Sequence, residues 1–341
     1  MILRFHMNEN PYSPARSIRE AAIKGLDQIN RYSESKYLIE LKKLLGDYNN
    51  VSSDRIVLSH GSDLLLREII NIFSKDRKII MVSPSFFPVA QYALKQASRF
   101  TKIQISSPDF KLDRNLLLKE LNEPTLLIID NPNNPTGRIL LDNELVEKIL
   151  QNKNALLLVD EAYYEFSGQT FAGLIIKYPN LAIIRTMDKA FSLAGLRLGY
   201  LLAGGFFKDQ FSDFPVFLSR PTLFAAIEAL KNPKYLTINV NNILSEKARL
   251  EKELTKIGIQ VFPGSTNFIL IKSNLPDFGK KLLDSGIIIK DLSEEWLNGF
   301  YRISIGLPEE NDTLLSIIKN IYKGTKKNKI MNISNRVNKT N

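Results

Sequence analysis

The sequence predicts an α/β fold in which helices cover both faces of a mostly parallel sheet. Nearly continuous apolar runs, such as LLIID and ALLLVD, alternate with helical patterns from about residue 37 to 205. Strands that are buried on both faces have this composition. The pattern changes after residue 230, where a long helix precedes further strands. The 341-residue length also suits a large α/β domain followed by a smaller α+β domain.

Each predicted strand of the first domain ends in a polar loop. RIVLSHGS is a strand and a turn before the helix LLLREIINIFS, and KIIMVSPSFF is the next strand, before the helix PVAQYALKQAS. TLLIIDNPNNPTG, ALLLVDEAYYEF and LAIIRTMDKAF repeat the pattern of a strand and then a loop. In open α/β sheets, ligands bind at the carboxyl ends of the strands. We therefore expect HGSD, SPSFF, DNPNNPTG, DEAYY and RTMDK to meet at one edge.

The second domain has a different order of elements. Residues 236–258 form one long helix, IQVFPGSTNFILIKS forms two strands, and another helix lies near 275–285. GIIIKD and FYRISIG are further strands, and 309–323 is the final helix. The predicted organisation is an N-terminal segment at 1–20 that packs near the active site, a large domain at 21–235, a small domain at 236–323, and a basic disordered tail at 324–341.

Composition excludes several kinds of site and partner. The chain has no cysteine, which excludes disulfides and thiolate metal sites, and its two histidines, His6 and His60, predict no metal cluster. The apolar runs are too short to span a bilayer, and no signal segment is evident, so we expect a cytoplasmic protein. Of the net charge of +10, the last 19 residues carry +6, which predicts a solubilising tail and no nucleic-acid partner.

Asp160, Tyr163 and Asn134 are candidate contacts for a bound ring. Asp160 follows ALLLV at the mouth of a buried strand, where a carboxylate is costly unless a cation, such as a protonated ring nitrogen, pairs with it. A helix N-cap is the alternative role. Tyr163 can direct its phenol to the same place. In NPNNPTG (131–137), Asn134 can offer an amide N–H to a phenolate-like oxygen, although this loop is also typical of an ordinary turn.

A phosphate site is expected beside this ring site. The N–H groups of Gly61, Ser62 and Asp63 open a predicted helix, and the start of a helix attracts anions. Thr186 adds a hydroxyl and Arg197 adds a guanidinium, and both groups suit phosphate oxygens.

Lys189 lies in RTMDKAFSLAGLRLGY (185–200), within the same set of loops. Phe86 offers a flat face there, unless it is a core aromatic. A phosphorylated, planar, cationic ring that condenses with a lysine is pyridoxal 5′-phosphate, so the residues predict a Lys189 Schiff base and carbanion chemistry at Cα of an amino compound.

The order of these motifs resembles that of fold-type I pyridoxal-phosphate aminotransferases of class I/II, most of all the histidinol-phosphate aminotransferases. The resemblance covers about residues 6–323. It is carried by NENPYSP (8–14), NRYSES (30–35), HGSD, NPNNPTG, VDEAYYEF, RTMDKAFSLAGLRLGY and YRISIG (301–306). It implies a mostly parallel seven-stranded sheet in the large domain and a homodimer.

The resemblance also implies a role for each matching position. Lys189 is the Schiff-base lysine and proton shuttle, Asp160 pairs with the pyridine nitrogen, and Phe86 stacks on the ring. Asn134 and Tyr163 bond the ring oxygen. The groups implied for the phosphate are Ser62 and Asp63 in the turn after Gly61, Thr186, Arg197 and the partner subunit's Tyr32.

The implied substrate contacts come from both ends of the chain. Arg302 takes the carboxylate of the donor or of the 2-oxo acid acceptor in a bidentate pair. Tyr12 and Asn10 lie in the N-terminal segment beside the substrate. Lys290 takes the place of an arginine that binds the substrate phosphate in histidinol-phosphate enzymes.

Asp188 and Phe217 also depart from the family pattern. Asp188 stands where a phosphate-binding serine is usual, so its carboxylate must point away or pair with a cation. Phe217 stands in place of an asparagine near the substrate pocket.

Three functions follow from these observations. The first is transamination of an amino donor, with 2-oxoglutarate as the acceptor, and L-histidinol phosphate is the donor that we expect. The nearest alternative is an aminotransferase that acts on aromatic amino acids or on a broad range of amino acids. The second is phosphothreonine decarboxylation in cobalamin synthesis. The third is a non-enzymatic, cofactor-bound regulator whose basic tail binds nucleic acid.

Overall fold

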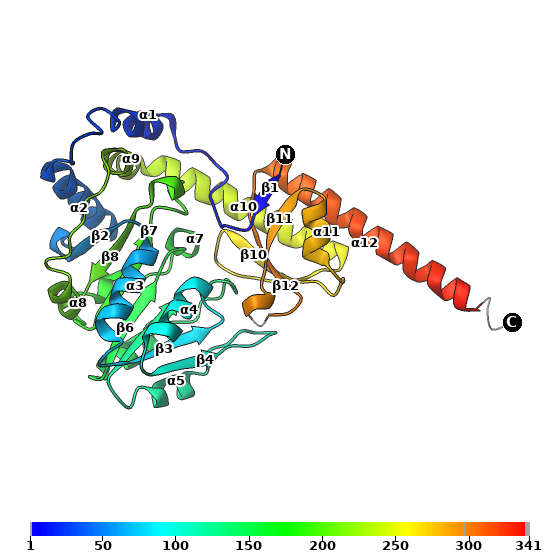
Figure 1. The fold of residues 1–341 in the computed structure, drawn as a ribbon, viewed down its shortest axis with the longest axis horizontal. Helices are drawn as coiled ribbons and strands as arrows, with labels where there is room; N and C mark the ends of the chain where they lie inside the picture. Colours follow the sequence, from blue (N-terminus) through cyan, green and yellow to red (C-terminus); the bar gives the residue numbers. More distant parts are fainter. Residues whose placement is uncertain (1, 296, 338–341) are drawn as a thin grey trace.

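The computed structural model describes residues 2–295 and 297–337, with side chains as far as residue 324. The chain forms a seven-stranded and a five-stranded sheet. Figure 1 shows the smaller sheet beside the larger one, with the final helix extending away from both. No helix within the described residues has the length and apolar character needed to cross a bilayer.

The large sheet is the predicted α/β sheet, and it is parallel apart from β8. The single reversal follows from the connection before β8. The 12 residues between β7 and β8, 187–198, contain only a 3₁₀ turn and no crossover helix, so the chain returns beside β7 in the opposite direction. Across the sheet the strands are β2 (Ile56–Ser59), β8 (Gly199–Ala203), β7 (Leu181–Thr186), β6 (Ala155–Asp160), β5 (Thr125–Asp130), β3 (Lys78–Ser83) and β4 (Phe100–Gln104).

Alternate residues of these strands enter two separate cores, which explains their continuous apolar runs. Ile128 and Leu158 face the core covered by α3, α4 and α8, whereas Ile129 and Leu157 face the core covered by the other helices. The helices of this domain are α1 (Arg16–Lys24), α2 (Ser35–Asn49), α3 (Ser62–Phe73), α4 (Phe87–Gln96), α5 (Arg114–Glu120), α6 (Asn143–Gln151), α7 (Tyr164–Ser167), α8 (Gly205–Gln210) and α9 (Arg220–Lys231), with 3₁₀ turns at Ser53–Arg55, Ala172–Leu174 and Ala194–Leu196.

The small sheet takes one strand from the N-terminus. Strand β1 pairs in parallel with β11, an arrangement absent from the prediction, which treated residues 1–20 as a separate segment. The sheet order is β1 (Leu3–Phe5), β11 (Ile287–Asp291), β12 (Phe300–Ser304), β10 (Phe268–Lys272) and β9 (Gln260–Phe262). Its helices are α10 (Pro233–Ile257), α11 (Phe278–Asp284) and α12 (Pro308–Val337), with a 3₁₀ turn at Ser293–Glu295.

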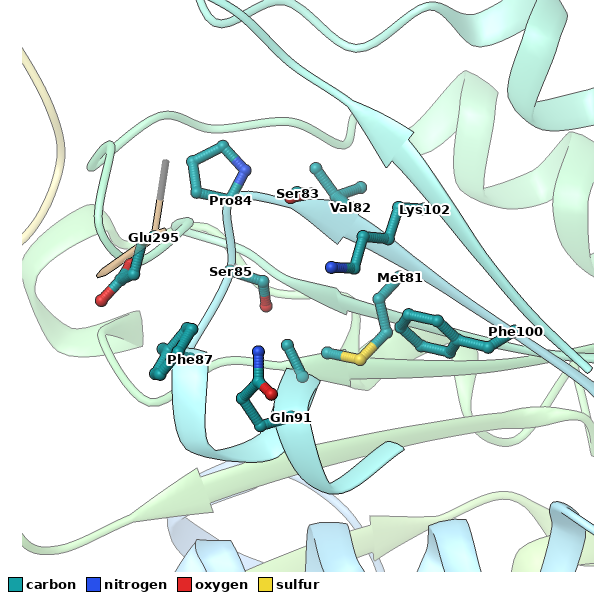
Figure 2. Close-up of a pocket in the computed structure, with 11 residues that line it drawn as sticks. Met81, Val82, Ser83, Pro84, Ser85, Phe87, Gln91, Phe100, Lys102 and Glu295 are labelled. Carbon is teal, nitrogen blue, oxygen red and sulfur yellow. The ribbon is translucent and has the colours of Figure 1, made fainter. Parts of the chain in front are cut away.

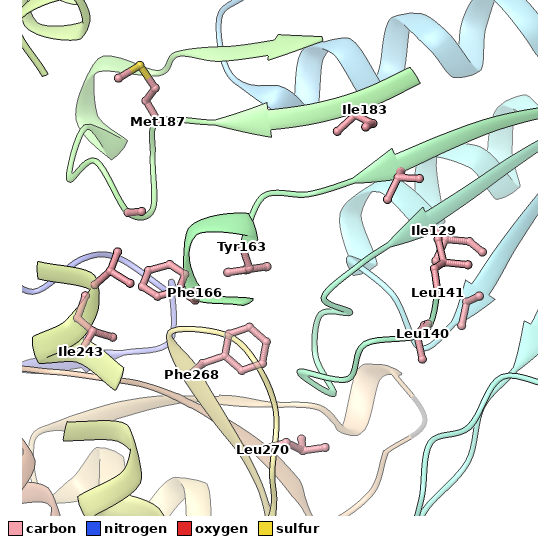
Figure 3. Close-up of a cluster of buried hydrophobic side chains, with 14 of the residues drawn as sticks. Ile129, Leu140, Leu141, Tyr163, Phe166, Ile183, Met187, Ile243, Phe268 and Leu270 are labelled. Atoms are coloured by element: carbon pink, nitrogen blue, oxygen red, sulfur yellow. The ribbon is translucent and has the colours of Figure 1, made fainter. Parts of the chain in front are cut away.

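One hydrophobic core continues from the large sheet into the small one. Phe268 and Leu270 of β10 belong to the same buried cluster as Ile129 of β5 and Phe166 of α7. Figure 3 shows these side chains between the two sheets, with Ile243 of α10 beside them. Burial of this apolar surface fixes the small domain against the strand ends of the large domain.

The final helix differs from the prediction. Helix α12 was expected to end at 323 and to be followed by a disordered tail at 324–341, but it continues to Val337; residues 338–341 lie outside the described part. Its first turns are anchored by buried Leu314 and Ile318. Once a helix is nucleated, extension is inexpensive for residues such as Lys, Met and Ile, and no proline follows Pro308 to stop it.

Candidate active site

Two buried carboxylates lie side by side at the carboxyl edge of the large sheet. Asp130 and Asp160 are the last residues of β5 and β6 and are direct neighbours in the register. Asp130 accepts hydrogen bonds from Asn133 Nδ2 at 2.9 Å and from the backbone N–H of Asn134 at 2.8 Å. Asp160 accepts one from the N–H of Ala162 at 3.0 Å.

Burial makes the negative charge of this pair costly. It raises the pKa of Asp130 to about 6 and, together with the neighbouring Asp130, the pKa of Asp160 to about 7. The Coulombic attraction of Lys189 opposes the second shift. The site therefore favours a cation beside Asp160.

Lys189 lies in the loop between β7 and β8, with its amine against the N-terminal segment. Its Nζ donates to the carbonyl oxygen of Met7 at 3.2 Å. Burial and the nearby Arg302 cation together lower the pKa of Lys189 to about 8, against the attraction of Glu9 and Asp160. An amine with this pKa carries a sizeable neutral fraction near neutral pH, as a nucleophile or a general base needs.

Asn134, Tyr163 and Arg302 come together on the small-domain side of this amine. Arg302 Nη1 donates to Asn134 Oδ1, which leaves the Asn134 amide N–H groups free to face the site. Arg302 Nη2 donates to the carbonyl oxygen of His6 at 2.7 Å, while buried Nε has no hydrogen-bond partner within the described residues. Burial raises the pKa of Tyr163 to about 12 against the attraction of Arg302.

The predicted anion site lies where α3 begins. Gly61 has φ +84°, and a Cβ there would collide with Arg197 Nη2 and Asp63 Oδ1. Gly199 of β8 likewise has no room for a Cβ, because the backbone nitrogen of Ser62 lies directly against it. These two glycines bring the start of the helix, the sheet and Arg197 into close contact.

Arg197 holds two carboxylates at this site. Its Nη2 donates to Asp63 Oδ1 at 2.6 Å, and its Nη1 is paired with Asp188 Oδ2. Asp188 is buried, and its Oδ1 has no hydrogen-bond partner in the described part of the chain. The Asp188 N–H donates to the hydroxyl of buried Thr186 at 3.0 Å. Of the two arrangements expected for Asp188, pointing away or pairing with a cation, the structure shows the second.

Lys290 lies next to Arg302 across the β11–β12 register. Its Nζ is 3.9 Å from Oε1 of Glu295, a buried acid that sequence reasoning missed. Burial raises the pKa of Glu295 to about 7 against the attraction of Lys290 and Arg302. Figure 2 shows Glu295 beside Pro84, Ser85 and Phe87, in a pocket next to the end of β3.

The remaining predicted residues have less contact with this centre. Phe86 is half-buried just before α4 and packs on the core of that face. Asn10 Nδ2 donates to the carbonyl oxygen of Ala190 at 3.0 Å. The pKa of Tyr12 is raised by burial and by Glu246 and Glu309, which lie on α10 and α12. Tyr32 is 83% exposed, and its ring centroid is 5.5 Å from that of Phe217.

Two further residues of this site were not predicted. Asp130 ends TLLIID just as Asp160 ends ALLLVD, so the strand pattern contained the signal for it. Asn8 opens the quoted motif NENPYSP, but nothing in the sequence indicates that its amide contacts Tyr163.

Comparison with known proteins decides the family. The model of the family described as aminotransferase class I and II matches residues 1–318 of the chain. The chain belongs to this family. It is 36% identical over 328 residues to a histidinol-phosphate aminotransferase from Sulfurisphaera tokodaii, covering 94% of this chain and 90% of that protein.

Solved structures share the fold of this aminotransferase. The histidinol-phosphate aminotransferase from Clostridium acetobutylicum superposes with a TM-score of 0.86 at 26% identity, covering 95% of this chain and all of that one (100%). The enzyme from Sinorhizobium meliloti, solved in complex with pyridoxal-5′-phosphate, gives a TM-score of 0.85 at 25% identity, covering 95% of this chain and 92% of that one. The predicted α/β fold and aminotransferase class are thereby confirmed.

Proposed function

We propose that this aminotransferase uses pyridoxal 5′-phosphate bound at Lys189, takes its amino group from L-histidinol phosphate and passes it to 2-oxoglutarate. One observation carries the proposal: the Lys189 amine, with its pKa lowered to about 8, interacts electrostatically with buried Asp160 at the strand edge of the large sheet and with buried Arg302 on β12 of the small sheet. A nucleophilic amine, an acid that favours a cation and an anion-binding arginine are the groups that this reaction needs.

The residues fit the cofactor in their chemistry. Asp160 is buried and suits a protonated ring nitrogen, and the free amide N–H groups of Asn134 and the phenol of Tyr163 suit a ring oxygen. Arg197 and the N–H groups at the start of α3 suit a phosphate. Phe86 supplies an aromatic face.

Each side chain then has a defined task. When bound, pyridoxal phosphate supplies an aldehyde for the amino group and a ring that withdraws electrons from the donor Cα. Lys189 Nζ would accept the proton from that Cα and would return it to the carbon on the other side of the amino nitrogen. Asp160 holds a proton on the ring nitrogen. Asn134 and Tyr163 orient the ring oxygen, and Arg197 binds the phosphate.

The first prediction concerns Asp188, one of the two carboxylates that pair with Arg197. Asp188→Ser removes a carboxylate from the proposed phosphate site and frees Nη1 of Arg197. We expect the dissociation constant of pyridoxal phosphate to fall by roughly tenfold, as loss of one like charge at short range implies. Equilibrium dialysis of the cofactor-free protein measures it. The control is Asp209→Ser, which removes a carboxylate from an exposed position of α8. Weaker binding by Asp188→Ser would mean instead that Asp188 orients Arg197.

Arg302 and Lys290 form the part of the site that we assign to binding the substrates. Histidinol phosphate has a phosphate and no carboxylate, whereas 2-oxoglutarate has carboxylates only. Arg302 is buried with an unpartnered Nε, and Lys290 lies half-buried beside it on β11. These two neighbouring cations can bind both substrates in turn. The planar guanidinium of Arg302 can form two parallel hydrogen bonds, whereas the ammonium group of Lys290 acts as a point charge.

Arg302→Lys is the second prediction. It keeps the charge but removes the planar fork, so we expect KM for 2-oxoglutarate to rise about 10- to 100-fold, with a smaller change in kcat. Steady-state kinetics measures both constants. Lys290→Gln is the matched variant, and it should raise KM for histidinol phosphate more than KM for 2-oxoglutarate. An unchanged KM for 2-oxoglutarate in Arg302→Lys would remove Arg302 from the substrate site.

We also propose that the enzyme is a homodimer and that Tyr32 reaches the phosphate site of the other subunit. The support is an exposed aromatic pair, since Tyr32 is 83% and Phe217 is 69% exposed. Large apolar side chains in such an arrangement favour a protein interface. His60, next to the phosphate turn, has its Nε2 3.1 Å from the carbonyl oxygen of Phe217, which links this surface to the site.

Product analysis tests the function. The protein is incubated with pyridoxal phosphate, 2-oxoglutarate and one donor at a time: histidinol phosphate, an aromatic amino acid or phosphothreonine. We expect glutamate to form with histidinol phosphate and no carbon dioxide to be released. Glutamate from the aromatic amino acid alone would assign a different substrate, and carbon dioxide from phosphothreonine would assign decarboxylation.

A further inference from the structure

Three consecutive residues of the N-terminal segment contact the three groups to which the proposed function assigns most of the chemistry. The His6 carbonyl oxygen accepts from Arg302 Nη2 at 2.7 Å, and the Met7 carbonyl oxygen accepts from Lys189 Nζ at 3.2 Å. Asn8 Nδ2 donates to the phenol oxygen of Tyr163 at 2.8 Å. Of the three, only Asn8 makes its contact through a side chain, so its role can be tested by substitution.

Asn8 is held by three hydrogen bonds with Ser304 and Asn267. It is 2% exposed and has φ +54°, a left-handed conformation that asparagine tolerates better than most residues. Its N–H donates to Ser304 Oγ at 2.8 Å, and its Oδ1 accepts from the same hydroxyl at 3.1 Å. Asn267 Nδ2 donates to its carbonyl oxygen at 3.0 Å. The small sheet therefore fixes both the backbone and the amide of Asn8.

These contacts determine which end of the amide faces Tyr163. Ser304 Oγ accepts from the Asn8 N–H and donates its own proton to Asn8 Oδ1, which places Oδ1 on the Ser304 side of the amide. The NH₂ group must then face the phenol, and the phenol oxygen acts as an acceptor there. A phenol has one proton. That proton must therefore point away from Asn8 and from the residues that hold Asn8.

We infer that Asn8 is a positioning residue: it forces the Tyr163 hydroxyl to donate its proton into the active site rather than into the protein. Because β1 and Ser304 belong to the small sheet, the small domain sets the direction of a hydrogen bond in the large domain. The inference rests on the proposed function, in which Tyr163 donates to the ring oxygen of the cofactor.

Asn8→Asp reverses this one hydrogen bond with little change in shape. An aspartate keeps an acceptor for Ser304 and tolerates the left-handed backbone, but its second oxygen accepts the phenol proton. The ring oxygen then loses a donor and retains its own proton to a higher pH. We expect the pH midpoint of the visible absorption band of the Lys189-bound cofactor to rise by about one to two units, the size expected for one hydrogen bond to a charged group.

Two controls separate this effect from loosening of the structure and from the new charge. Asn267→Ala removes the hydrogen bond that anchors the Asn8 carbonyl oxygen and leaves Ser304 to orient the amide, so its midpoint should stay near that of wild type. Tyr163→Phe should raise the midpoint, and Asn8→Asp in that background should add no further shift. Thermal unfolding of the cofactor-free variants reports any general loss of stability.

The outcomes are distinct. A raised midpoint in Asn8→Asp that disappears in the Tyr163→Phe background supports the inference. A wild-type midpoint in Asn8→Asp overturns it, and so does an equal further shift in the double variant, which would show a direct effect of charge. If wild type forms no visible band with pyridoxal phosphate, the proposed function fails, and this inference fails with it.

Discussion

Lys189→Ala is expected to lower the transamination rate by roughly 10⁴-fold or more, because it removes a nucleophile and a general base together. The Lys189 amine is the group whose pKa burial and Arg302 lower to about 8 at the strand edge. The charge of Lys189 opposes the raised pKa of Asp160, and we expect no other lysine of the described residues to substitute for it. Single-turnover transfer from histidinol phosphate measures the loss.

Two comparisons make this prediction specific. Lys189→Arg keeps a cation but cannot form the covalent bond, so it should be nearly as inactive as Lys189→Ala. A small primary amine added to Lys189→Ala should restore part of the proton transfer, because it supplies the missing base. Activity within tenfold of wild type in Lys189→Ala would contradict the assignment.

Asp160→Asn has the second-largest expected effect, a loss of about 10²- to 10⁴-fold in kcat. The amide has the same shape but cannot hold a proton on a ring nitrogen. Asp130→Asn is the matched control, since Asp130 is equally buried at the end of the neighbouring strand and is already bonded by Asn133 and Asn134. Its effect on kcat should be much smaller. Equal losses in both variants would indicate a shared structural role.

Asp160 also makes the stability of the cofactor-free protein depend on pH. Burial raises the pKa of Asp160 to about 7, so the folded state binds more protons than the unfolded state, in which the pKa is about 4. The contribution of this group to stability is therefore present below about pH 4 and is lost as the pH rises to about 7. In Asp160→Asn the melting temperature should fall less between pH 5 and pH 8 than in wild type.

The parts of the site that could be predicted are those that follow directly from strand periodicity. Each buried strand ends in a polar loop, and parallel strands bring those ends to one edge, so the sequence alone predicts that Asp160 and Lys189 lie together. The resemblance placed Asn134 and Arg302 beside them, and the structure joins these two by a hydrogen bond. Their functional roles remain predictions.

The parts that could not be predicted depend on contacts between distant segments. Asn8 and Tyr163 are 155 positions apart, and their bond exists because β1 joins the small sheet, a pairing of only three residues. Strand β8 carries the same apolar pattern as its parallel neighbours, so its direction is set by a short connection and not by its composition. Helix α12 passes the expected stop because a basic, polar sequence is not by itself a helix terminator.

The most direct test of the proposed chemistry is an absorption titration of the purified protein with pyridoxal phosphate and then with histidinol phosphate. We expect a visible band from cofactor joined to Lys189, its loss on addition of histidinol phosphate, and its return when 2-oxoglutarate is added. The band should be absent from Lys189→Ala. A band that forms equally in Lys189→Ala, or one that histidinol phosphate leaves unchanged, would contradict the account.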